Sequence, residues 1–134
     1  MNINELRRIV FKAREVFEQH HVHIGKTFFG DFPNYSCGCS ADVLAQYLIS
    51  KGAKNFTYVY GKREGSSHGW LELDDLIIDI TGDQFKDGVE AVYISSNRDF
   101  HDQFSPLNKN DKPGVHGILW DSYNKFKALM EPNS

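Results

Sequence analysis

The chain has 134 residues, of which 40% are hydrophobic, and it carries a formal net charge of -3. This length suits one domain with a substantial buried core, so we expect residues 1–134 to form a single domain. The acidic balance disfavours a general nucleic-acid binder, and charged residues interrupt every apolar run that could span a membrane. The N-terminus lacks a signal-like apolar core, which predicts a cytoplasmic protein. Together these features predict a protein with neither nucleic acid nor membrane as partner.

Two helices are predicted in the first part of the chain. Apolar residues recur at helical spacing from Asn4, the predicted N-cap, to about His20. Segment 20–36 contains glycine and proline without periodicity, which indicates a long ordered loop. A second helix should follow the two cysteines and end at Gly52.

The middle of the chain has the composition of β-strands. Strands are predicted over 55–61, 68–73, 76–80 and 89–95. Asp74 and Asp75 would form a tight turn between the second and third of these strands.

The last part of the chain should be a loop followed by a helix. Segment 97–115 is polar and contains prolines, which predicts a loop, and the helix should run from about His116 to Met130. Its inward side would carry Leu119, Trp120, Tyr123, Phe126 and Met130. The order of elements predicts an α+β fold in which a small antiparallel sheet packs against an N-terminal helical part.

Two cysteines, Cys37 and Cys39, lie at the start of the predicted second helix. The N-terminus of a helix stabilises a thiolate and can lower its pKa from about 8.5 to between about 3.5 and 7.5. The same N–H groups can stabilise an oxyanion. We expect Cys37 to be the nucleophile because it lies one step further out of the helix, whereas Cys39 should pack inside the first turn. Three alternatives remain: structural buried cysteines, a redox-active pair, and a zinc site completed by histidines.

A two-residue turn at 74–75 would fix which strand residues share a face. One face collects the apolar residues Leu71, Leu73, Leu76, Ile78 and Ile80. The other face collects His68, Trp70, Glu72, Ile77, Asp79 and Thr81. On this second face His68 and Asp79 would be diagonal neighbours, roughly 7 Å apart or less, so the carboxylate could orient the imidazole. We expect this face to lie outside the core, with an exposed approach to His68. The alternative is that His68 and Asp79 are ordinary solvated residues of a half-exposed sheet.

Other polar residues are weaker candidates. They are His20, His21 and His23 at a helix end, His101 and His116 as further bases or ligands, Asp83 as a rival orienting acid, and Gln84 as a hydrogen-bond donor in a pocket.

Two segments, FPNYSCGCSADVLAQYL from Phe32 and SHGWLELDDLIIDITGDQF from Ser67, together resemble the papain-like and transglutaminase-like cysteine enzyme superfamily. The order of cysteine, histidine and aspartate is similar to that of the superfamily. The resemblance implies a papain-like or transglutaminase-like fold, with Cys37 as nucleophile, His68 as general base and acid, and Asp79 as the residue that orients His68.

Together, the residues and the resemblance predict a cysteine-dependent hydrolase or acyl-transfer enzyme that acts on an amide bond through a thioester. It would be a deamidase, amidase or peptidase for a protein, peptide or small amide substrate, with no cofactor and no bound metal. One alternative is a non-catalytic binding domain of the same fold. The other is a metal-binding protein that uses Cys37, Cys39 and a histidine. The sequence leaves the substrate and the oligomeric state open.

Overall fold

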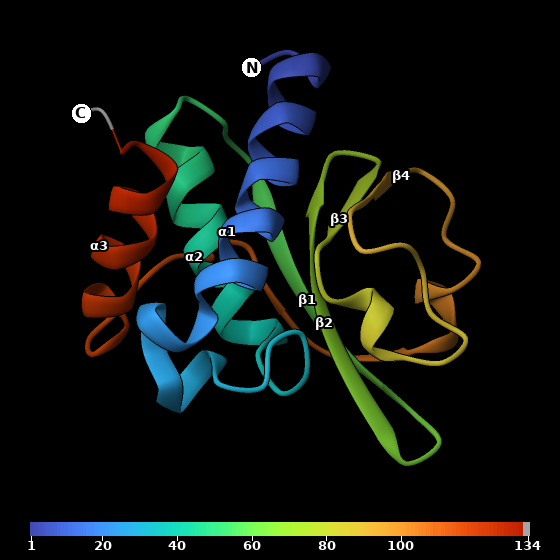
Figure 1. Ribbon diagram of the computed structural model, residues 1–134. Coiled ribbons are helices and arrows are strands. Elements are labelled where there is room, and N and C mark those ends of the chain that lie inside the picture. Colours follow the sequence, from blue (N-terminus) through green and yellow to red (C-terminus); the bar gives the residue numbers. More distant parts are fainter. Residues whose placement is uncertain (133–134) are drawn as a thin grey trace.

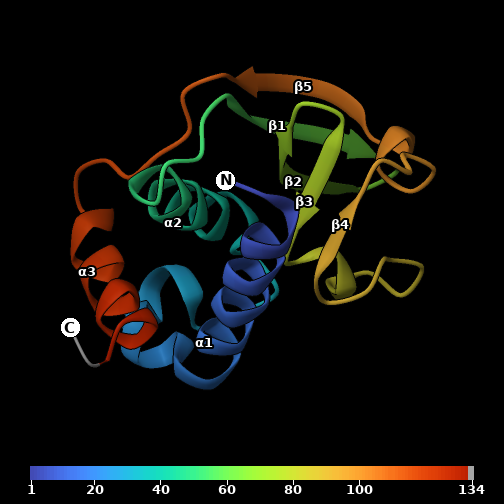
Figure 2. The same cartoon turned by 90° about the horizontal axis from the view of Figure 1, so that it is seen from above.

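The computed structural model describes residues 1–132 and confirms the α+β class. The helices are α1 (Ile3–Phe29), α2 (Cys37–Ser50) and α3 (Leu119–Met130), and they lie together on one side of the sheet (Figures 1 and 2). The strands are β1 (Phe56–Arg63), β2 (Ser66–Leu73), β3 (Leu76–Asp79), β4 (Tyr93–Ser95) and β5 (Ser105–Asn110), with short 3-10 turns η1 (Gly82–Gln84) and η2 (His101–Gln103). No helix within residues 1–132 combines the length and the apolar character needed to cross a membrane.

Helix α1 is longer than predicted at both ends. Its N-cap is Asn2, not Asn4, because the Asn2 side chain accepts a hydrogen bond of 2.8 Å from the Glu5 N–H. The helix continues through the first part of the predicted loop, with non-helical angles at His20 and Gly25. The prediction of a loop over 20–36 is therefore wrong as far as Phe29, whose ring is fully buried and stacks 5.3 Å from that of Phe17.

The sheet is antiparallel, with the strand order β4-β3-β2-β1-β5. The predicted two-residue turn is confirmed, since Leu73 pairs with Leu76 and Asp74 has the left-handed φ of 53°. The predicted end of α2 is also confirmed: Gly52 follows it with a φ of 100°. β4 is shorter than the predicted strand over 89–95.

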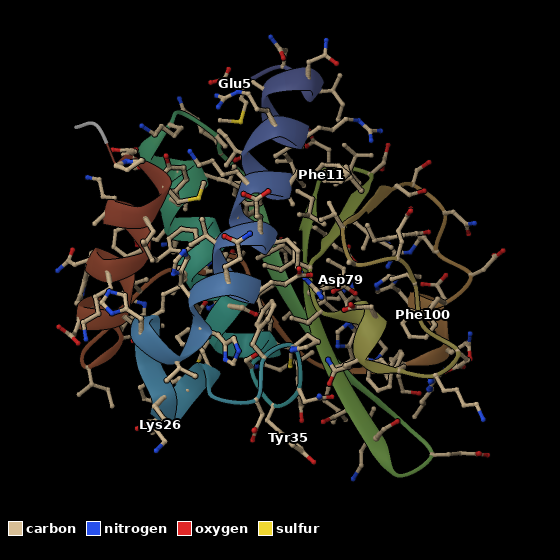
Figure 3. The ribbon with its side chains drawn as sticks, viewed as in Figure 1. Glu5, Phe11, Lys26, Tyr35, Asp79 and Phe100 are labelled. Atoms are coloured by element: carbon tan, nitrogen blue, oxygen red, sulfur yellow. The ribbon has the colours of Figure 1, made fainter. Side chains whose placement is uncertain are left out.

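Both faces of the sheet are covered, which corrects the prediction of one wet face. The helix face packs against the main core. The opposite face carries a second cluster formed by Val59, Trp70, Ile77, Phe100 and Phe104. Phe100 lies on the side of the sheet away from the helices (Figure 3). Segment 97–104 folds over this face because its apolar residues are buried there against the apolar side chains of the central strands.

The predicted loop over 97–115 is wrong for 105–110, which forms the edge strand β5 against β1. All six residues of β5 are exposed, so they show none of the alternation by which a strand is recognised in sequence. α3 begins at Leu119, later than predicted, and Trp120 is 44% exposed and does not face inward.

A buried arginine joins α1 to the chain that follows β3. The Arg14 guanidinium donates hydrogen bonds of 2.6 Å to the Ile80 carbonyl oxygen and of 2.7 Å to each oxygen of Asp83. It also pairs with Glu18 one turn along the helix and lies 5.0 Å from the Phe32 ring centroid. These contacts hold the segment between β3 and η1 against α1.

Arg14→Ala should lower the free energy of unfolding by about 3 kcal/mol, because it leaves Asp83 and the Ile80 carbonyl without their partner. Arg7→Ala, on the exposed side of the same helix, should change it by less than about 0.5 kcal/mol. Urea denaturation of the two variants measures both values. Equal stability of the two variants would contradict a structural role for Arg14.

Candidate active site

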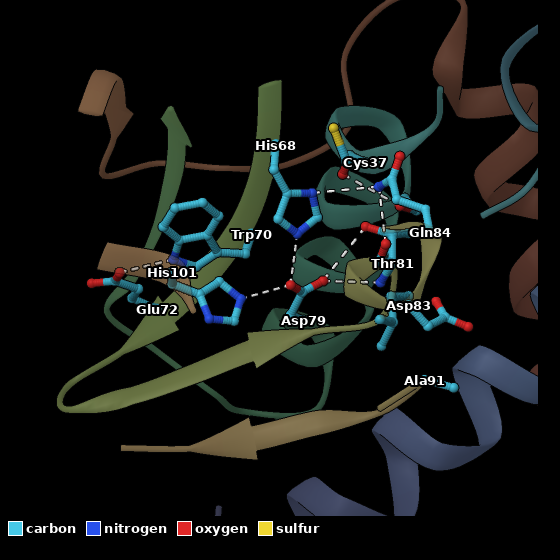
Figure 4. A network of polar contacts seen from close by, with 12 residues as sticks. Cys37, His68, Trp70, Glu72, Asp79, Thr81, Asp83, Gln84, Ala91 and His101 are labelled. Atoms are coloured by element: carbon cyan, nitrogen blue, oxygen red, sulfur yellow. Dashed lines mark hydrogen bonds and ion pairs between the residues drawn. The ribbon is translucent and has the colours of Figure 1, made fainter. Parts of the chain in front are cut away.

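Cys37 is the first residue of α2, where the N–H groups of the first helical turn have no carbonyl partner within the helix. β3 pairs with β2 only from Leu71 to Leu73, so in this part of the fold His68 and Gly69 lie beyond the end of the β3 pairing. The N-terminus of α2 occupies this position and brings the thiol beside the imidazole of His68 (Figure 4). The start of α2 and the part of β2 that has no β3 partner thus lie next to each other at the Cys37 sulfur.

The surroundings of Cys37 favour its thiolate. Burial alone would raise the pKa of the thiol. The hydrogen bond and positive charge of His68, together with the backbone N–H groups of Gly69 and Gly38, outweigh burial and lower that pKa below its ordinary value. A lowered thiol pKa increases the fraction of the nucleophilic form near neutral pH.

His68 and Asp79 lie in direct contact. The imidazole Nε2 is 2.7 Å from Asp79 Oδ2, and both side chains are buried, with 0% and 1% of their surface exposed. Because Nε2 is held by Asp79, Nδ1 is the ring nitrogen left to interact on the side of Cys37 and Gln84 (Figure 4). The structure thus confirms that His68 and Asp79 lie close together on one face of the hairpin.

Burial would lower the pKa of His68, but the charge and hydrogen bond of Asp79, with a further contribution from Cys37, raise it to about 9. Burial would raise the pKa of Asp79, but His68 and His101 hold it well below its usual range. The three groups therefore favour a thiolate, an imidazolium and a carboxylate arranged in sequence.

His101 is the residue that sequence reasoning placed wrongly. It was expected in a polar loop, yet it is 1% exposed and its Nε2 lies 2.7 Å from the same Asp79 oxygen that His68 contacts. Its Nδ1 has no hydrogen-bond partner among residues 1–132. The aromatic residues on either side, Phe100 and Phe104, are the sequence signal that could have indicated burial.

Asp79 is fixed by a third donor from the chain that follows it. Its Oδ1 accepts a hydrogen bond of 2.9 Å from the Thr81 N–H. The carboxylate therefore receives donors from β2, from η2 and from the turn after β3. Its position is set by tertiary structure, and it is part of the core, contrary to the prediction from the hairpin alone.

An aromatic shell surrounds His68, so the prediction of an exposed approach to this residue is wrong. The ring centroids of Phe85, Trp70 and Phe104 lie 5.1, 5.6 and 5.8 Å from that of the imidazole. Arg63 covers the outside of the shell, 4.7 Å from the Phe104 centroid, and is held there by Asp87 at 2.6 Å. The shell excludes water from the His68–Asp79 contact and so strengthens its electrostatic attraction.

Two neighbours of the pair have other partners. Gln84 Nε2 donates to the Thr81 carbonyl oxygen at 2.9 Å and lies 3.4 Å from His68 Nδ1. Asp83, the rival acid of the sequence prediction, is paired with Arg14 and has a structural contact. Cys39, expected to pack inside the first turn of the helix, is partly buried against the main core, and burial with the charges of Asp42 and Cys37 raises the pKa of its thiol.

The remaining histidines lie elsewhere. His21 contacts the Phe29 carbonyl oxygen at 2.9 Å, and His23 and His116 are exposed. Within residues 1–132 the group of side chains close enough to share a metal ion is His68, Asp79 and His101, without either cysteine. The two cysteines are therefore not brought together with histidines into the metal site that the alternative interpretation required.

The thiol has little space behind it. A cavity of about 10 Å³ between α2 and the sheet is lined by Cys37, Trp70, Asp79 and Thr81 among others, and it could hold a single water molecule. A molecule that reacts with the sulfur would therefore approach from the outer side of the α2 N-terminus. Tyr35, two residues before Cys37, is 91% exposed there with a φ of 60° (Figure 3).

Comparisons of the chain with models of protein families, with curated proteins and with solved structures found no significant match.

Asp79→Asn should raise the pKa of the Cys37 thiol, because a neutral amide cannot stabilise the imidazolium that stabilises the thiolate. Below that pKa, each unit of increase removes about tenfold of the thiolate, so the alkylation rate at pH 6 should fall at least tenfold. The variant should also lose stability, since the amide cannot accept all three hydrogen bonds of the carboxylate. Iodoacetamide alkylation followed from pH 5 to 9 measures the shift.

Asp83→Asn is the matched control for this measurement. It should weaken the contact with Arg14 and lower stability, yet leave the pH profile of alkylation unchanged. If Asp83→Asn moved the profile and Asp79→Asn did not, the orienting carboxylate would be misassigned.

Proposed function

We propose that the protein is a cysteine-dependent enzyme that cleaves an amide bond through a thioester, as a deamidase, amidase or peptidase. The observation that carries the proposal is the contact between His68 Nε2 and Asp79 at 2.7 Å, which commits one ring nitrogen to the acid and leaves the other for the thiol of Cys37. The low thiol pKa and the position of Cys37 at a helix start support it.

In the proposed reaction the Cys37 thiolate attacks the carbonyl carbon of the amide. The new C–S bond forms as the carbonyl π electrons move onto oxygen, which gives a tetrahedral oxyanion. When the oxyanion collapses, the C–N bond breaks and His68 Nδ1 gives its proton to the leaving amine. Asp79 remains a carboxylate throughout and holds the Nε2–H.

The second half of the reaction returns the thiolate. Water gives a proton to His68 Nδ1 as its oxygen attacks the thioester carbonyl carbon. Collapse of this second tetrahedral species breaks the C–S bond and releases the carboxylic acid. An amine in place of water would give acyl transfer with the same residues.

A papain-like or transglutaminase-like relationship is part of this proposal. It is supported by a nucleophile at a helix N-terminus and by the chain order of cysteine, histidine and aspartate on a helix, a strand and the next strand. The substrate class we propose is a protein, a peptide or a small amide.

Iodoacetamide should modify Cys37 selectively near neutral pH. The fast thiol should disappear in Cys37→Ser and persist in Cys39→Ser, because the two cysteines have pKa values shifted in opposite directions. His68→Gln should move the alkylation profile to higher pH, since it removes the charge that stabilises the thiolate. Peptide mapping by mass spectrometry identifies the modified residue. Loss of the fast thiol in Cys39→Ser alone would exchange the roles of the two cysteines.

Incubation with 4-nitrophenyl acetate should produce a burst of 4-nitrophenol and an acetyl group on Cys37 that is subsequently hydrolysed. His68→Gln should slow acetylation by about 10²–10⁴-fold, the range of a general acid–base group. Stopped-flow absorbance follows the burst, and intact-protein mass spectrometry follows the acyl group. Acetylation of folded protein no faster than of urea-unfolded protein would favour the alternative, a non-catalytic binding domain.

A further inference from the structure

Gly38 and Gly69 flank the thiol and the imidazole, and neither has a positive φ. Their backbone angles are therefore open to any residue, so conformational freedom does not explain glycine at these two positions. At Gly69 the space does, because one side chain occupies it, and the same side chain is in contact range of Gly38.

That side chain is Tyr58 on β1. Tyr58 pairs with Leu71, so Gly69 is its diagonal neighbour on the same face of the sheet, and the ring lies across the missing side chain. A Cβ at Gly69 would overlap the Tyr58 hydroxyl and lie 2.7 Å from its Cε1. A Cβ at Gly38 would lie 3.4 Å from the same hydroxyl. The phenol oxygen is thus enclosed between β2 and the first turn of α2, next to Cys37.

The phenol keeps its proton at this position. Burial raises the pKa of Tyr58, and the charge and hydrogen bond of Cys37 raise it further. A neutral phenol beside a thiolate has a single arrangement that satisfies both groups, in which the O–H donates to the sulfur. This donor is therefore already positioned beside the sulfur, which carries negative charge before the reaction and loses it during the reaction.

We infer that Tyr58 is a catalytic residue whose hydroxyl donates a hydrogen bond to the oxyanion formed when Cys37 attacks its substrate. The inference rests on the proposed function of Cys37. As the C–S bond forms, negative charge moves from the sulfur to the former carbonyl oxygen. The Tyr58 hydroxyl then donates its hydrogen bond to this oxygen in place of the sulfur and keeps its proton. The backbone N–H of Gly38, in the first turn of α2, is the second donor to the same oxygen.

Gln84 fits this role less well than Tyr58. Its amide nitrogen donates to the Thr81 carbonyl oxygen at 2.9 Å and lies 3.4 Å from His68 Nδ1. One of its two N–H groups is thus committed to the Thr81 carbonyl oxygen. The Tyr58 hydroxyl has the sulfur as its partner, so it becomes available when the sulfur loses its charge.

The test compares two reagents for the same thiolate. Alkylation by iodoacetamide forms no oxyanion, whereas acylation by 4-nitrophenyl acetate does. At a pH where the thiol is fully ionised, Tyr58→Phe should slow acylation of Cys37 about 10- to 100-fold and change alkylation less than twofold. Gly69→Ala, which forces the hydroxyl from its place, should give the same selective loss. Tyr60→Phe, two residues along the same strand, is the control and should change neither rate.

The outcomes separate this inference from the proposed function. If Cys37 is acylated rapidly and Tyr58→Phe slows acylation less than threefold, Tyr58 is not an oxyanion donor although the enzyme assignment stands. Equal slowing of both reagents also overturns the inference, since it assigns Tyr58 to the thiolate or to packing. If Cys37 of the unmodified sequence is not acylated, the proposed function fails, and Tyr58 has no catalytic role to lose. Should Gly69→Ala fail to fold, Tyr58→Phe alone decides.

Discussion

The buried carboxylate of Asp79 is the group on which the rest of the structure depends. Removing an ionised carboxylate from water costs several kcal/mol unless donors replace the water. Here the donors come from His68 on β2, His101 on η2 and Thr81 after β3, so one carboxylate joins three segments of the chain. The return of segment 97–104 across the sheet is therefore part of the same interaction, because it brings His101 to the carboxylate and the phenylalanines that enclose it.

The enclosure has an electrostatic result at the thiol. With water excluded, the attraction between Asp79 and His68 is stronger than it would be on an open sheet face, and the pKa of His68 rises to about 9. The imidazolium in turn lowers the pKa of Cys37. The ionisation of a half-buried sulfur at the helix start is thus set by a carboxylate that the sulfur does not touch. The packing of side chains on the far face of the sheet therefore influences the ionisation of the Cys37 thiol beside β2.

The sequence was informative where structure is local. Helical periodicity located α2, and the apolar alternation after Leu71 gave the hairpin register, which placed His68 beside Asp79. It failed where tertiary contacts decide. The polar segment with two prolines has no pattern that predicts the pairing of β5 with β1, and Phe100 and Phe104 could indicate burial near His101 but not its contact with Asp79. The Tyr58 hydroxyl was missed because its place follows from the pairing of β1 with β2, a contact that no local pattern specifies.

The loop before α2 has a consequence for how this protein could change over evolutionary time. Tyr35 lies in that loop and is largely exposed, whereas the side chains that set the ionisation of Cys37 belong to β2, β3 and η2. A substitution at the exposed Tyr35 leaves these groups in place, so this position can change in sequence while the ionisation of the sulfur is kept. Lineages could therefore differ in the surface beside the thiol while inheriting the same ionisation of Cys37.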